Sequence, residues 1–348
     1  MDTQKKCFLL TMAVLLSLSV TFLIATPITA EEKWPSSVIV GSFVKGSASY
    51  PTNVAIARLI SKYTPAKGVI REYAGGTPGT EALVRGDIHT WSQGQGDFLN
   101  AYYGTGFWKG KPLDIRLLIG TWFLGPIAFG IRPNEGINSI KDLAKKRCMV
   151  KSFIPFQNQA AETIMKHAGV WDKATIVEMA STGDLAPAMI EKKIDCYIWA
   201  IGAAYTLEIK KAVGMDWISL TEEEQRAAVA AVTGIVPWTA PRWILEMYDY
   251  PPNKVLRSVA YCFAYSVRAD MPDDVAYGIL KAVYGNNHLD EVRSLSKDLT
   301  DTNIELAVKY AWIPFHSGAV KYYKERGVWT GEMEAKQKEF LAKRGFSK

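Results

Sequence analysis

The sequence predicts an α/β clamshell of two lobes, with a mostly parallel sheet in each lobe. Continuous apolar runs, typical of strands buried on both faces, alternate with segments of helical spacing. This alternation occurs in two series, separated by a break at residues 133–136 (PNEG). The chain has 348 residues, 48% of them hydrophobic, and is therefore long enough for two cores. We expect lobe I to contain residues 31–130 and 255–348, and lobe II residues 131–254.

The N-terminal residues indicate export. Two lysines precede an apolar run over residues 8–25, and small residues end at Ala30, directly before two glutamates. This order is typical of a secretory signal peptide, so we expect cleavage after Ala30 and a mature protein in the periplasm. The alternative is a retained membrane anchor, because the run approaches the length that spans a bilayer.

Charge and cysteine usage exclude two classes. The 41 Lys and Arg side chains against 35 Asp and Glu form no long basic block, which argues against nucleic-acid binding. Three cysteines follow the predicted cleavage site: Cys148, Cys196 and Cys262. An odd number in apolar runs argues against a disulfide framework and indicates small buried side chains.

The stretch 38–60 sets the pattern of the first series. Residues 38–40 predict a buried strand, and a loop with Gly41 and Gly46 follows. We expect Ser49 to be the N-cap of the next helix, with Pro51 in its first turn. A strand, a glycine loop and a helix N-terminus in succession suit an anion, because unpaired backbone N–H groups converge there.

Two further predicted strands end in the same way. The strand 68–73 leads into GGTPG at 75–79, and we expect Thr77 to be the N-cap of a helix that ends at Gly86. The strand 90–92 leads into QGQGD at 93–97, with Asp97 as the expected N-cap. In an open α/β sheet such loops gather at the carboxyl ends of the strands, where ligands bind.

The second series is predicted over residues 139–220. Its expected strands are 147–151, 175–179 and 194–199, and its expected helices are 157–168, 184–191 and 202–211. Capping boxes are predicted at 139–142 and 221–224. The proline-rich residues 237–252 are interpreted as a linker. A long strand over 255–267 and helices over 272–284 and 303–310 complete the chain.

Catalytic motifs are absent from the sequence. The four histidines have no metal-binding spacing, no GxSxG segment occurs, and the loop at 41–47 lacks the lysine of a P-loop. We therefore expect no enzyme activity, no metal and no cofactor. An exported hydrolase is the alternative that remains open.

Several segments resemble the TAXI family, the substrate-binding receptors of TRAP transporters. They are the first loop ending in Tyr50, GGT at 75–77, the glutamine loop at 93–97, AYYG at 101–104, SIKDLAKKRCMV at 139–150, IDCYIWAIG at 194–202 and PFHSGAVKYYKERG at 314–327. The last of these is the most specific. Two loops depart from the family pattern: GSFVKGSASY at 41–50 and SFIPFQNQ at 152–159.

The resemblance implies a type II-like periplasmic-binding-protein fold and a small organic acid as ligand. Dicarboxylates and glutamate-like compounds are typical of the family. Its partners would be the membrane subunits of a TRAP transporter, with no nucleic acid, and we expect a monomer. The alternative is an orphan sensor that presents its bound state to a signalling partner.

Nine residues are the predicted ligand contacts: Lys45, Tyr50, Gly75, Gly76, Thr77, Gln93, Gln95, Gln157 and Asn158. Gly75, Gly76 and Thr77 are expected to hold a carboxylate at a helix N-terminus. Lys45 would replace donors lost at Phe43 and Val44. Six aromatic residues are interpreted as core, although aromatic walls are also what a small-molecule cleft uses: Trp91, Trp122, Phe153, Phe156, Trp199 and Trp238.

Overall fold

The computed structural model describes residues 34–151 and 155–343. The residues from Pro35 onward form one compact unit. The predicted signal peptide and its cleavage site lie outside the described residues. Within the described ranges, no helix combines the length and the apolar character that crossing a membrane requires.

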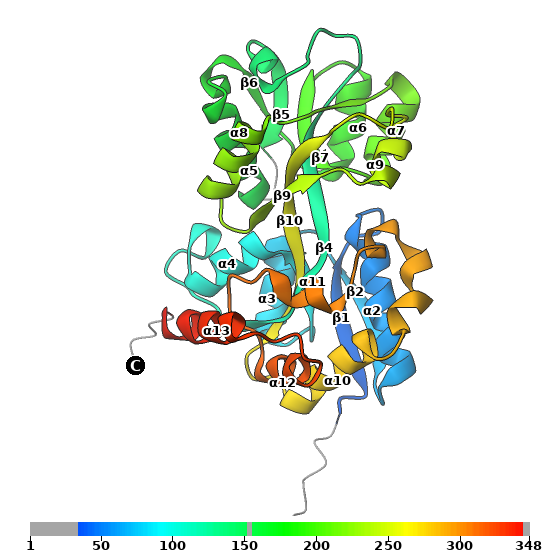
Figure 1. Cartoon of the computed structure of the whole chain (residues 1–348), viewed down its shortest axis with the longest axis vertical. Coiled ribbons are helices and arrows are strands. Elements are labelled where there is room, and N and C mark those ends of the chain that lie inside the picture. Colours follow the sequence, from blue (N-terminus) through cyan, green and yellow to red (C-terminus); the bar gives the residue numbers. More distant parts are fainter. Residues whose placement is uncertain (1–33, 152–154, 344–348) are drawn as a thin grey trace, which may run out of the picture. The chain divides into compact units, whose positions relative to one another are not determined.

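Two long antiparallel strands connect the two halves of the fold. They are β4 (Ile115–Ile131) and β10 (Arg257–Arg268). The paired region begins with Ile115 opposite Arg268 and ends with Ile127 opposite Val259. The main sheet has the order β3–β10–β4–β7–β5–β6. Figure 1 shows β4 and β10 running through the middle, with helices grouped around both ends.

Lobe I, as named here, surrounds the N-terminal strands. Strand β1 (Ser37–Phe43) pairs in parallel with β2 (Lys67–Tyr73), and Val40 forms a parallel bridge to Thr90, next to β3 (Trp91–Gly94). Strand β3 is antiparallel to β10. The helices of this lobe are α2 (Ser49–Tyr63), α3 (Gly76–Arg85), α4 (Gln95–Tyr103), α10 (Asp273–Tyr284), α11 (Ile304–Lys309), α12 (Ser317–Glu325) and α13 (Gly331–Lys343).

Lobe II contains the strands of the second series. Strand β5 (Arg147–Lys151) is parallel to both β6 (Thr175–Glu178) and β7 (Cys196–Ala200). Strands β7 and β8 (Asp216–Ile218) pair with the far half of β4, and β9 (Ile235–Thr239) pairs with β10. The helices are α5 (Pro155–His167), α6 (Leu185–Ile190), α7 (Ala204–Val213), α8 (Glu222–Ala231) and α9 (Arg242–Met247).

The lobe II sheet is buried on both faces. Side chains of β4 alternate: Ile127 and Phe129 join one apolar cluster, and Ala128 joins the other. Ile198 and Trp199 of β7 divide between the same two clusters. Because both faces are covered, these strands have continuous apolar sequences rather than an alternating pattern.

The α/β class is confirmed, and the sheet is mixed. Parallel pairs lie on its flanks, and antiparallel pairs surround β4 and β10. Both predicted capping boxes are present, at Ser139 with Asp142 and at Thr221 with Glu224. The limits of the lobes in the sequence, at residues 130 and 255, stay a prediction.

Three predicted N-caps and one predicted linker are wrong. The N-caps of α2, α3 and α4 are Ala48, Gly75 and Gly94, so these helices begin one to three residues before the predicted start. None of the three residues makes a side-chain cap hydrogen bond. Residues 237–252 contain β9 and α9 instead of a linker. Strand β9 tolerates Pro237 because it lies at an edge, where a missing N–H breaks no ladder.

Candidate functional site

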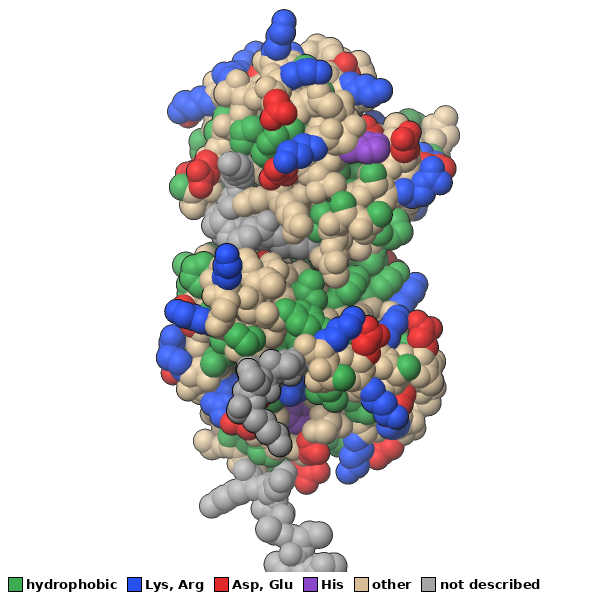
Figure 2. Space-filling model, turned by 90° about the vertical axis from the view of Figure 1, so that its left-hand side faces the viewer, with side chains coloured by type: hydrophobic (Ala, Val, Ile, Leu, Met, Phe, Trp, Pro, Cys, Tyr) green, Lys and Arg blue, Asp and Glu red, His purple; other side chains and the backbone are tan. Residues whose placement is uncertain are grey.

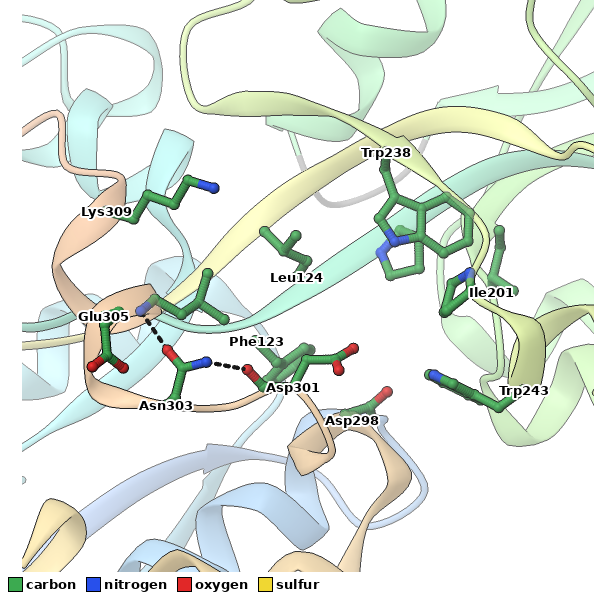
Figure 3. A pocket seen from close by; sticks show the side chains of 13 residues that line it. Phe123, Leu124, Ile201, Trp238, Trp243, Asp298, Asp301, Asn303, Glu305 and Lys309 are labelled. Carbon is green, nitrogen blue, oxygen red and sulfur yellow. Dashed lines mark hydrogen bonds between the residues drawn. The ribbon is translucent and has the colours of Figure 1, made fainter.

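A cavity of about 300 Å³ lies where the two lobes meet at β4. Lobe II contributes Ile201, Trp238, Pro241 and Trp243, and lobe I contributes the segment from Asp298 through α11. The lining residues are Phe123, Leu124, Pro126, Ile201, Trp238, Pro241, Trp243, Asp298, Asp301, Asn303, Glu305, Leu306 and Lys309. Figure 3 shows the two indole rings on one side and the Asp298 and Asp301 carboxyl groups on the other.

Local sequence explains how the two tryptophans reach the cavity. Trp238 lies on β9 opposite Ser258 of β10, and its carbonyl oxygen accepts a hydrogen bond from Gln225 at 2.8 Å. Pro241 is the N-cap of α9, so Trp243 lies in the first turn of that helix. The Trp243 indole nitrogen is buried and has no hydrogen-bond partner among the described residues.

The lobe I side of the cavity is acidic. Among the described residues, Asp298, Asp301 and Glu305 line it together with one cation, Lys309. Burial raises the pKa of Asp298 to about 6, against a small opposing effect of the Ser296 hydroxyl. Lys309 carries its ammonium group over the ring of Tyr310, 5.1 Å from the ring centroid.

A further carboxyl group, that of Asp97, influences the same region through Tyr261. Asp97 is in the first turn of α4, and desolvation raises its pKa to about 7. Burial raises the pKa of Tyr261 on β10, and the charges of Asp298 and Asp97 raise it further. These two carboxyl groups therefore act on one phenol. The ring of Tyr261 packs beside Gly125, where an added Cβ would lie 2.3 Å from it.

None of the nine predicted contacts lines the cavity within the described residues. The two loop glutamines point into the protein. Gln93 donates to Thr80 Oγ1 at 3.1 Å and accepts from the Trp91 indole at 3.0 Å. Gln95 donates to the carbonyl oxygens of Gly120 and Tyr310. Both amides thus have a structural role.

The other predicted contacts lie in the first loop, in α2 and in α5. Lys45 has an exposed side chain, and its backbone N–H donates to Glu72 at 3.0 Å. Tyr50 is half-buried in the first turn of α2. Gln157 of α5 donates to the Ile198 carbonyl oxygen at 2.8 Å, and Asn158, next to it, is half-buried.

The glycine loop does form a helix N-terminus. Gly75 is the N-cap of α3, and Gly76 and Thr77 are its first residues. A Cβ at Gly76 would lie 2.6 Å from the Gln93 side-chain oxygen, so this glycine allows close packing against Gln93. The carboxylate predicted at this position stays a prediction.

The sequence did not predict Trp243 or the acidic wall of the cavity, which is formed by Asp298, Asp301 and Glu305. Asp298 and Asp301 lie in irregular sequence without a motif, and Trp243 follows the prolines interpreted as a linker. Of the six aromatic residues interpreted as core, Trp238 lines the cavity. Trp91, Trp122 and Trp199 are buried as expected. Phe153 and the side chain of Phe156 lie outside the described residues.

No group of three or more metal-binding side chains occurs in the described part of the chain. His89 accepts the Ile39 N–H, and His316 is the N-cap of α12, where its Nδ1 accepts the Gly318 N–H at 3.2 Å. Cys148, Cys196 and Cys262 are buried and free. These residues therefore serve the fold.

Comparison with known proteins gives a family. The profile described as the NMT1-like family matches residues 41–327. The chain belongs to the NMT1-like family. The match supports this family but does not identify the chain as a TAXI receptor, the kind of protein that the motifs resemble.

Solved structures show the fold. A structure described as a periplasmic transporter matches at 11% identity over 90% of this chain and 99% of that one, with a TM-score of 0.50. The zinc-bound ligand-binding component of an ABC-type import system from Staphylococcus aureus matches at 13% identity, 85% and 93% coverage and a TM-score of 0.49. The periplasmic aliphatic sulphonate binding protein SsuA of Escherichia coli matches at 12% identity, 89% and 88% coverage and a TM-score of 0.47. The match at a TM-score of 0.50 shows that this NMT1-like chain shares the α/β fold of the structure described as a periplasmic transporter.

Proposed function

We propose that this NMT1-like protein is an extracytoplasmic receptor that captures one small solute for a membrane transporter. The observation that carries this proposal is the cavity between the lobes. It has a volume in the range that suits a small molecule, and both lobes contribute to its walls. Family membership and the fold support the same function. A periplasmic location follows from the predicted signal peptide.

The two long strands provide a mechanism for capture. Strands β4 and β10 connect the lobes, so a change in their bend moves Trp238 and Trp243 relative to Asp298 and Asp301. A ligand that touches both walls makes more contacts when the lobes are closed. It therefore shifts the population toward the closed state by this difference in binding free energy. The closed state then presents one combined surface to the partner.

The partner is proposed to be the membrane subunits of a TRAP-type transporter. The support for this type is the resemblance of the motifs at 75–77, 101–104 and 314–327 to TAXI receptors. A sensor that delivers its bound state to a signalling protein is the second candidate, because the same closure would serve it. Figure 2 shows acidic and basic side chains interspersed over both lobes on the face it displays, which suits a protein partner better than nucleic acid.

The test of this function uses ligand carried through purification. The mature protein is denatured, the released small molecules are identified by mass spectrometry, and the compound is returned to refolded protein in a calorimeter. We expect one ligand per chain and recovery of the compound unchanged. Conversion of the compound to a product would indicate an enzyme, and the absence of any retained or rebinding compound would refute the receptor function.

A further inference from the structure

We propose that the solute in this cavity is an organic cation, held between the acidic wall of lobe I and the indole rings of lobe II. This inference rests on the proposed receptor function and deepens it. It differs from the organic acid that the sequence resemblance implied. Three independent features of the cavity support it: its charge, its unpaired carboxyl groups and its aromatic walls.

The first feature is the sign of the lining charge. Three carboxyl side chains, Asp298, Asp301 and Glu305, line the cavity against one amine. Lys309 is at the opposite end from the tryptophans in Figure 3, and its ammonium group already contacts the Tyr310 ring. No arginine is among the lining residues of the described chain. An anionic solute would enter a site of its own sign.

The second feature is the lack of counter-charges. The ion pairs between described residues involve none of Asp298, Asp301 and Glu305. Asp298 is partly buried, and its carboxylate accepts a hydrogen bond from the Ser296 hydroxyl at 3.3 Å, whereas Asp301 and Glu305 are exposed. A carboxylate withdrawn from water without a partner is unfavourable, and a bound cation would supply that partner.

The third feature is the opposite wall. Trp238 and Trp243 line the lobe II side of the cavity, and in Figure 3 the Trp243 ring extends toward Asp298. The face of an indole ring carries negative electrostatic potential and attracts a cation within about 6 Å of its centroid. Aromatic rings on one side and carboxylates on the other are the groups that recognise an ammonium or guanidinium compound. Phe123 and Leu124 add an apolar surface for its carbon skeleton.

The predicted anchors for an acid do not offset this arrangement. Lys45 is exposed and Gly76 packs against Gln93, and neither residue lines the cavity. The N-terminus of α3 therefore gives no positive charge to the walls described above. The cavity is complementary to a cation with an apolar body.

The experiment compares three probes with the same five-carbon skeleton on mature, ligand-stripped protein. They are 1,5-diaminopentane, glutarate and 1,5-pentanediol, with tetramethylammonium as a compact fourth probe. Binding is followed by thermal shift and by quenching of tryptophan fluorescence at pH 7.5. We expect the two ammonium probes to raise the Tm and quench the indoles, and the diol and glutarate to do neither. A higher Tm with glutarate would overturn the proposal. So would an unchanged Tm with both ammonium probes at concentrations up to about 50 mM, which is on the order of the weakest useful affinity.

Variants connect the result to the cavity. Asp298→Asn and Asp301→Asn should each weaken ammonium binding about tenfold, since a hydrogen bond to a charged group is lost. Asp172→Asn removes the same charge from an exposed position in the Trp171–Lys173 turn, and it should leave the affinity unchanged. Trp243→Leu should weaken binding and reduce the quenching. Equal affinities in Asp298→Asn, Asp301→Asn and Asp172→Asn would contradict this assignment.

Proton linkage provides a second readout, which a merely structural role of Asp298 would not produce. Asp298 has a pKa of about 6 in the ligand-free protein, so ammonium binding should weaken as the pH falls below 6. Further titratable groups of this region in the described part of the chain include Asp301, Glu305, Lys309, Tyr205, Tyr261 and Asp97. If the retained compound is neutral or anionic and binds one to one, the cation proposal fails while the receptor function stands.

Discussion

Gln95 Nε2 donates a hydrogen bond of 2.8 Å to the carbonyl oxygen of Tyr310, 215 residues further along the chain. The same amide also donates to Gly120, and its oxygen accepts the Trp312 N–H at 3.2 Å. One buried side chain thus joins α4, β4 and the segment that follows α11. This residue, predicted to contact the ligand, thus fixes the helix that carries Glu305 and Lys309 to the strand that connects the lobes.

Replacing Gln95 with leucine should therefore lower stability. The variant keeps the volume but leaves two carbonyl oxygens and one N–H without a partner. We expect the free energy of unfolding to fall by about 2–4 kcal/mol, since each buried polar group left unsatisfied costs about 1–3 kcal/mol. Urea denaturation measures this. Stability equal to that of the parent protein would show that the three contacts are not formed.

The approach of Tyr261 to Gly125 gives a second prediction. An alanine Cβ at residue 125 would lie 2.3 Å from the Tyr261 ring, whereas at Gly94 the nearest ring atom is 3.5 Å away. Gly125→Ala should destabilise the protein by about 1–3 kcal/mol, and Gly94→Ala should have little effect. Thermal unfolding of both variants tests this. Equal losses of stability in Gly125→Ala and Gly94→Ala would contradict the closer contact of Gly125 with Tyr261.

The partly buried carboxyl group of Asp97 predicts a dependence of stability on pH. Its pKa in the folded protein is about 7, above its ordinary value of 3.8, because desolvation disfavours the charged form. Its contribution is therefore most favourable below pH 3.8 and is lost as the pH rises through 7. Asp97→Asn does not titrate, so its stability relative to the parent should rise between pH 4 and pH 8, with the two proteins most similar at pH 4. A constant difference across this range would contradict the raised pKa.

Lys45→Ala separates the sequence-based site from the cavity. The Lys45 side chain is exposed and does not line the cavity, so we expect the affinity for the retained solute to change less than twofold. Calorimetry on the parent and the variant measures this. A loss of tenfold or more would return the ligand to the first glycine loop and would support the carboxylate predicted there.

Local sequence patterns predicted most of the fold because burial of a strand and capping of a helix depend mainly on neighbouring residues. The apolar runs around Ile127 and Ile198 indicate strands that are covered on both faces. The pair Thr221 and Glu224 is sufficient to indicate the start of a helix, because it forms a capping box. The prolines around β9 were misleading, since Pro237 is tolerated only by virtue of an edge position that the sequence does not reveal.

The cavity was less predictable because long-range folding creates it. Asp298 and Trp243 are separated by more than fifty residues and belong to no common motif. Gln93 and Gln95 have the composition of a binding loop, yet their amides point inward toward Thr80 and Tyr310. Residue type shows that a group can bind a ligand, and the tertiary contacts show whether it is free to do so.

Closure of the lobes around one solute is the central claim, and small-angle X-ray scattering tests it most directly. The mature protein is measured after its ligand is removed, and again with the retained compound at saturation. We predict a smaller radius of gyration with the ligand, because its contacts with both walls favour the closed state. An unchanged radius of gyration at saturation would contradict the account.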